Sequence, residues 1–121
     1  VSNAGVVATD VSGVGTARKQ LAACTYGYDK GIFAYGSTGS NVSMSNLVST
    51  SGVIASDVTG VGSARHELAA TQYGGDKAIF GYGYTSGRVS LSNLVSNAGV
   101  VATDTTGVGT ARNVLAACSY N

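Results

Sequence analysis

The segment YGGDKAIFGYGYTSGRVSLSNLVSNAGVVATDTTGVGTAR, residues 73–112, repeats YGYDKGIFAYGSTGSNVSMSNLVSTSGVIASDVTGVGSAR, residues 26–65. The first two copies agree at 29 of 47 positions, and a third, partial copy agrees with the first at 21 of its 27 positions. Periods of about 20 to 50 residues are typical of repeat architectures, in which each unit buries its apolar faces against its neighbours. We therefore predict a single repeat domain over residues 1–121, with repeat 1 at 1–47, repeat 2 at 48–94 and a partial repeat 3 at 95–121.

Each period contains four short extended segments separated by turn residues. They are expected at 77–84, 89–95, 100–103 and 111–118, because these runs are apolar, β-branched or alternating. Four strands in about 47 residues is the size of one propeller blade. The predicted fold class is therefore all-β, with β-propeller blades of four antiparallel strands. A helix over 16–24 is an alternative, since Thr16 is a good N-cap and good helix formers follow it.

The order of residues within a period resembles a kelch-type propeller repeat. An arginine is followed by small residues, a hydrophobic strand, two glycines and a later strand before the next arginine. These features are Arg65, Leu68-Ala-Ala70, Ala78-Ile-Phe80, Gly81 and Gly83, Val100-Val-Ala102 and Arg112. The resemblance covers the whole chain and implies a β-propeller.

Composition excludes some classes of partner. The net charge is +1, with no basic stripe, which argues against nucleic acid. No apolar run approaches the roughly 20 residues that a membrane-spanning helix needs, so we expect no membrane insertion. Cys24 and Cys118 occupy equivalent positions. A disulfide between them is possible, although we favour small buried apolar side chains.

The repeat number predicts association between chains. The 121 residues hold about 2.6 repeats, whereas a closed propeller usually has about four to eight blades. An unpaired apolar strand edge is a template for another chain. We therefore expect a homo-oligomer or a filament formed through unpaired blade edges, or a part of a longer array, with closure or extension only by association.

Charged residues recur in every copy. Asp10, Asp57 and Asp104 each precede an arginine by eight positions, and these arginines are Arg18, Arg65 and Arg112. We interpret the six residues as structural ion pairs that fix a loop through charge-assisted hydrogen bonds. The alternative is a ring of charged groups around a channel mouth.

Positions that differ between copies are the candidates for recognition, because the scaffold is shared. Loops on a rigid scaffold often carry binding residues. The candidates are Lys19, Asn41, His66, Tyr84 and Arg88.

No catalytic or metal-binding set is visible, and we expect no cofactor. The predicted function is a non-enzymatic β-propeller repeat module for structural assembly or for binding a protein or glycan. One alternative is a symmetrised or truncated propeller without a biological ligand. Another is a propeller enzyme with a site at the channel mouth.

Overall fold

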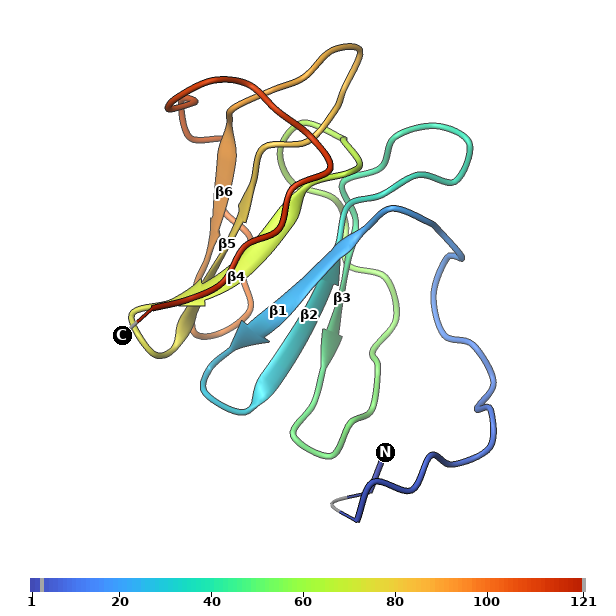
Figure 1. Cartoon of the computed structure of the whole chain (residues 1–121). Coiled ribbons are helices and arrows are strands. Elements are labelled where there is room, and N and C mark those ends of the chain that lie inside the picture. The colour runs from blue at the N-terminus through green and yellow to red at the C-terminus, as the bar shows by residue number, and fades with distance from the viewer. Residues whose placement is uncertain (3, 121) are drawn as a thin grey trace.

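The computed structural model describes residues 1–2 and 4–120, and its regular structure is all-β, as predicted (Figure 1). Two three-stranded antiparallel sheets follow one another along the chain. The first consists of β1 (Ala22–Tyr26), β2 (Lys30–Ala34) and β3 (Ser45–Val48). The second consists of β4 (Ala69–Tyr73), β5 (Lys77–Gly81) and β6 (Ser92–Val95). The alternative of a helix over 16–24 is wrong, since β1 begins within that segment.

The two sheets have the same register, displaced by one period. Ala23 pairs with Phe33 in the first sheet, and Ala70 pairs with Phe80 in the second. The edge strands likewise correspond, because Phe33 pairs with Asn46. The sequence repeat is therefore also a repeat of backbone hydrogen bonding.

The predicted third segment of the period lies beside β6 without forming a full strand. Two isolated bridges, Val95 to Val101 and Ser92 to Thr105, join it to the sheet edge. Residues 54–58 lie along β3 in the same way, and Ala55 N donates to Leu47 O at 2.9 Å. Each sheet therefore has three strands and a bridged outer segment, rather than the four full strands predicted.

The prediction of a strand over 111–118 in the same blade is wrong. These residues form no strand, and their equivalents, β1 and β4, pair with the strands that follow them. The first strand of each hairpin pairs along its whole length with the second, and residues 111–118 have no such partner among the described residues. The structural units are therefore residues 16–58, which we call unit 1, and residues 63–105, which we call unit 2.

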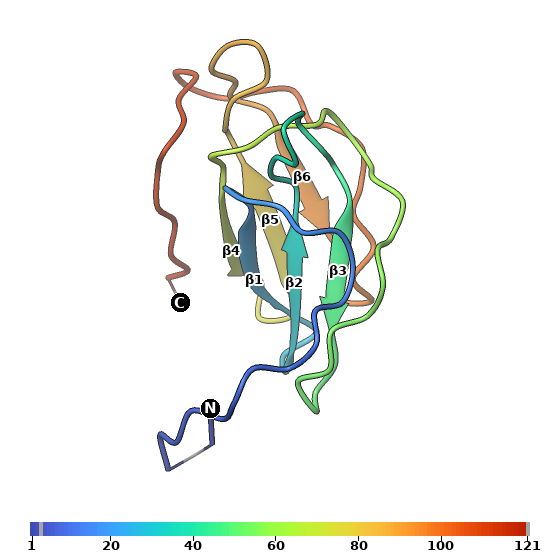
Figure 2. The same cartoon turned by 90° about the vertical axis from the view of Figure 1, so that its right-hand side faces the viewer.

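The units pack sheet against sheet (Figure 2). β1 lies against β4 and β5, and side chains alternate between the two faces of each strand. Ile32 and Ala34 point toward unit 2, where Ala78 and Phe80 meet them in one buried cluster. Phe33, on the opposite face of β2, is 36% exposed.

Candidate functional site

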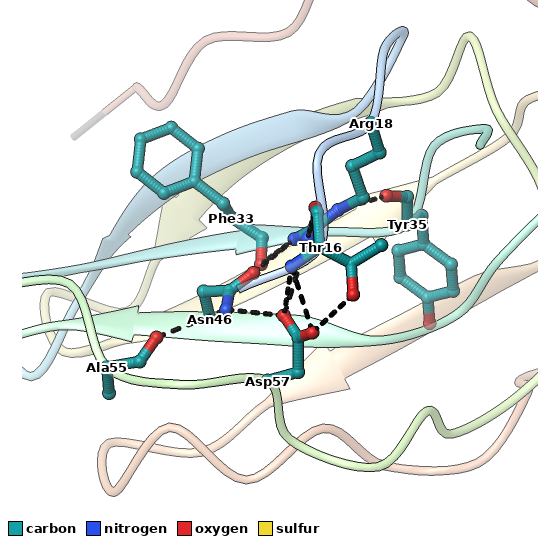
Figure 3. A network of polar contacts seen from close by, with 7 residues as sticks. All are labelled: Thr16, Arg18, Phe33, Tyr35, Asn46, Ala55 and Asp57. Atoms are coloured by element: carbon teal, nitrogen blue, oxygen red, sulfur yellow. Dashed lines mark hydrogen bonds and ion pairs between the residues drawn. The ribbon is translucent and has the colours of Figure 1, made fainter. Parts of the chain in front are cut away.

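A polar network closes unit 1 by joining its first and last segments (Figure 3). Arg18 lies at its centre, with Nε donating to Tyr35 O at 2.9 Å and Nη2 donating to Asn46 Oδ1 at 2.6 Å. The Asn46 amide in turn donates to Asp57 Oδ1 at 2.8 Å and to Ala55 O at 3.1 Å. The network therefore connects the segment before β1, the end of β2, β3 and the outer segment.

Asp57 receives hydrogen bonds from the segment that precedes β1. Thr16 N donates to Asp57 Oδ2 at 3.0 Å, and Thr16 Oγ1 donates to the same oxygen at 2.6 Å. The adjacent Gly15 has a φ of +76°, and a Cβ there would lie 2.5 Å from Asp57 Oδ1. A glycine is therefore required on two counts, conformation and space.

The network favours the ionised carboxylate. The hydrogen bond from the Thr16 hydroxyl contributes most to lowering the pKa of Asp57, followed by the bond from Asn46, with a smaller contribution from the Arg18 charge. Burial lowers the pKa of Arg18, against the opposing effect of the Asp57 charge. Arginine keeps its charge at any ordinary pH, so the pair remains ionic.

Unit 2 repeats this network with equivalent residues. Arg65 Nε donates to Tyr82 O at 2.8 Å, Ser63 Oγ donates to Asp104 Oδ2 at 2.6 Å, and Asn93 Nδ2 donates to Asp104 Oδ1 at 2.9 Å. Burial would raise the pKa of Asp104, but the hydrogen bonds from Ser63 and Asn93 outweigh it and lower the pKa. Two contacts differ, since the buried Asn93 Oδ1 has no partner and Arg65 is in none of the ion pairs found between described residues.

The predicted charged residues meet across the sequence repeat. Arg18 Nη1 lies 3.8 Å from Asp57 Oδ1, so Asp57 pairs with the arginine that precedes it by 39 positions rather than with Arg65, eight positions later. Asp10 makes none of the ion pairs found between described residues, and Arg112 stacks on an aromatic ring instead. Arg18 and Arg65 are thus bound mainly to carbonyl and amide oxygens within their own units.

A tyrosine forms the joint between the units. Tyr35 is fully buried, with the Arg65 guanidinium 4.1 Å above its ring and the Phe80 ring 5.4 Å away in an edge-to-face arrangement. Its hydroxyl donates to Val61 O at 3.2 Å. Cation–π and edge-to-face contacts of this kind are both favourable. We call this set, Tyr35 with Arg65, Phe80 and Val61, the tyrosine joint.

The same joint begins again after unit 2. The Arg112 guanidinium lies 4.2 Å from the centre of the Tyr82 ring, and the Tyr82 hydroxyl donates to Val108 O at 3.3 Å. Backbone bonds repeat as well, since Gly36 N donates to Arg65 O at 2.9 Å and Gly83 N donates to Arg112 O at 3.0 Å. The contacts between successive units are therefore periodic.

The loop candidates lie at one edge of the joint. His66 Nδ1 and Asn41 Oδ1 are 2.7 Å apart, the Asn41 amide donates to Thr85 O at 2.9 Å, and the His66 and Tyr84 rings lie 5.5 Å apart. Asn41 belongs to unit 1, whereas the other three belong to unit 2. The variable positions thus contact one another across the joint.

The remaining two candidates are exposed. Arg88 Nε donates to Asn113 Oδ1 at 3.1 Å, which is the next contact of the Asn41–His66 type along the chain. Lys19, the equivalent of His66 in unit 1, is exposed, and its backbone pairs with Ser37.

Sequence reasoning missed two parts of the joint. The Glu67 carboxylate accepts from Gln20 Nε2 at 2.8 Å and from Asn113 Nδ2 at 2.6 Å, and none of these three residues is among the predicted site residues. Tyr35 was also missed, although a tyrosine before a glycine recurs as Tyr82. The presence of this tyrosine in both copies was the signal that could have identified it.

The cysteines lie apart from this site. Both thiols are free, with Cys24 partly buried and Cys118 exposed, so the interpretation of both as small buried side chains is wrong for Cys118. Burial raises the pKa of Cys24 to about 11. Cys118 lies in the segment that forms no strand, which explains its exposure.

Within residues 1–2 and 4–120, no three His, Cys, Asp or Glu side chains cluster closely enough to hold a metal ion. The same residues include no helix that is long and apolar enough to cross a membrane. Comparison with family models and with curated proteins finds no match. The geometry of the joint is therefore the basis for any functional conclusion.

Proposed function

We propose that the protein is a non-enzymatic structural repeat module of β-propeller type, in which 47-residue units stack face to face to build a larger assembly. The supporting observation is the tyrosine joint, which occurs in corresponding form at Tyr35 and at Tyr82. A contact that recurs at the period adds one unit after another. Repeat proteins gain stability through such nearest-neighbour interfaces.

The proposal of a propeller rests on the arrangement of strands in each unit. Three antiparallel strands and a bridged outer segment make a four-part blade, and the segment after the outer edge leads to the first strand of the next unit. This connection is that of successive propeller blades. The kelch resemblance stays a prediction consistent with this arrangement.

The test is a chain lengthened by one unit. A second copy of residues 48–94 is inserted after Leu94, so that the seam keeps the sequence Ser-Asn-Leu-Val. The added 47 residues should raise the free energy of unfolding by about 2 to 7 kcal/mol, at about 0.05 to 0.15 kcal/mol per residue. Urea unfolding followed by circular dichroism measures it, with a single transition expected.

The control is the same insertion with Arg65→Ala and Phe80→Ala in the added copy. These changes remove two sides of one tyrosine joint and should abolish the gain. An unmodified insertion that unfolds separately, or that adds no stability, would refute the stacking module.

A second candidate is protein or glycan binding at the edge that carries Arg88 and Lys19, since both side chains are exposed there. Binding on a glycan array that an Arg88→Ala variant loses would support it. The structural role has the stronger support, because the neighbouring Asn41 and His66 already bind each other across the joint.

A further inference from the structure

The face of unit 1 that points away from unit 2 contains an open hollow of about 200 Å³. Val14, Arg18, Leu21 and Phe33 line it, and we call it the Arg18 hollow. An apolar cavity of about 150 Å³ takes up benzene, so the volume suits one phenol ring. The hollow combines an apolar wall with part of the Arg18 side chain, of which 4% is exposed.

The Arg18 hollow is the vacant counterpart of the place that Tyr35 fills. Moving its lining residues by one period gives Val61, Arg65, Leu68 and Phe80, and three of these four contact Tyr35 in the tyrosine joint. Exposure agrees with this, since Phe33 is 36% exposed and Phe80 is 0% exposed. The hollow therefore has the chemistry of a tyrosine site.

We propose that the Arg18 hollow binds Tyr82 from a second copy of this chain, joining copies head to tail. This inference rests on the proposed stacking function and names its intermolecular site. Tyr82 has nearly the same backbone conformation as Tyr35, with a φ of +62° against +64°, and each tyrosine is followed by a glycine. The intermolecular joint is thus a continuation of the joint inside the chain.

A second polar contact also fits this arrangement. Inside the chain, Gln20 Nε2 donates to Glu67 Oε1 across the joint at 2.8 Å. Between copies, Glu67 of the first chain would face Gln20 of the second. The same amide–carboxylate bond then joins the two copies, with the carboxylate in the first chain and the amide in the second.

Within a single chain, residues 110–120 pack only loosely against unit 2. Residues 110–120 lie beside β4, as Figure 1 shows, with hollows of about 230 and 340 Å³ along it. No second strand supports this segment, whereas β1 brings the whole of unit 1 with it. A second copy therefore displaces the segment and buries more surface.

One like-charge contact opposes association. The contact between Asn41 and His66 inside the chain becomes Arg88 against Lys19 between copies, because each position moves by one period. Exposed like charges repel weakly and are screened by salt. Association should therefore strengthen as the ionic strength rises.

The test measures self-association by sedimentation velocity over a wide range of chain concentrations. Val14→Lys places a charge in the Arg18 hollow and should weaken association about tenfold or more. Val7→Lys is the matched control, since Val7 is 76% exposed and lies outside the hollow. Lys19→Asn removes the repulsion and should tighten association about two- to fivefold, with loss of the salt effect.

Each outcome decides the proposal. A concentration-dependent increase in mass that Val14→Lys abolishes and Val7→Lys leaves intact supports it, whether the product is a ring or a filament. Monomers for both the wild type and Lys19→Asn overturn it, as does association that Val14→Lys leaves unchanged. The lengthened chain described above needs no self-association, so failure here and failure of the stacking function are distinguishable.

Discussion

Truncation of Tyr35 is the most direct test of the joint between the units. The side chain is fully buried and contacts Arg65, Phe80 and the Val61 carbonyl. Removing a buried aromatic side chain destabilises a protein by about 3 to 5 kcal/mol. About 1 to 2 kcal/mol of this is expected from the guanidinium–ring contact, since the pair is shielded from water.

The assay is urea unfolding monitored by circular dichroism. With a slope of about 1.5 kcal/mol per molar urea, Tyr35→Ala should lower the midpoint by about 2 to 3 M. Tyr35→Phe removes only the hydroxyl and should lose about 1 kcal/mol. This milder variant keeps the test informative if Tyr35→Ala does not fold.

The equivalent residue provides the matched control. Tyr82 is likewise followed by a glycine, but it is only partly buried and stacks on Arg112 of the loosely held segment. Tyr82→Ala should therefore lose about 1 to 2 kcal/mol. Equal losses at the two tyrosines, or a loss below about 1 kcal/mol at Tyr35, would refute the view that the joint holds the units together.

Two further predictions concern the polar networks. The folded-state pKa values of Asp57 and Asp104 lie below the ordinary value, so the stability that these carboxylates contribute is present above about pH 4 and is lost as the pH falls through the folded-state values. The urea midpoint of unfolding should therefore drop between about pH 7 and pH 3. An equal drop in an Asp57→Asn/Asp104→Asn variant would contradict this. Gly15→Ala should destabilise the chain by more than about 2 kcal/mol, because its Cβ would meet Asp57, whereas Gly5→Ala has the same φ of +76° and open space and should lose only about 1 to 2 kcal/mol. Thermal unfolding compares the two variants, and similar losses would exclude the steric cause.

The all-β class could be predicted from the sequence because the apolar runs are short and bounded by glycines. The division into units could not, since residues 111–118 were grouped with the strands that precede them, whereas the equivalent strands β1 and β4 pair with the strands that follow them. Residues 116–118, Ala-Ala-Cys, repeat the first three residues of β1 and still form no strand. Strand formation here depends on the partner as much as on local propensity.

The candidate site was predictable in its residues but not in its pairing. The repeated aspartates and arginines were found, but the sequence did not say which aspartate meets which arginine, and the fold brings Asp57 to Arg18. A spacing of eight says little when the chain turns back between β3 and the outer segment. Asn41 and His66 were predicted as binding candidates because they differ between the copies, and the sequence alone could not show that their side chains contact each other.

The closure of each polar network inside one unit also has a genetic consequence. Recombination between misaligned copies removes or adds 47 codons at a time, and every product keeps complete networks and matching joints. An insertion or deletion of another length within a strand shifts its register and moves a tyrosine off its arginine. Genes that encode this repeat should therefore differ in length by whole periods, with the fold acting as the filter.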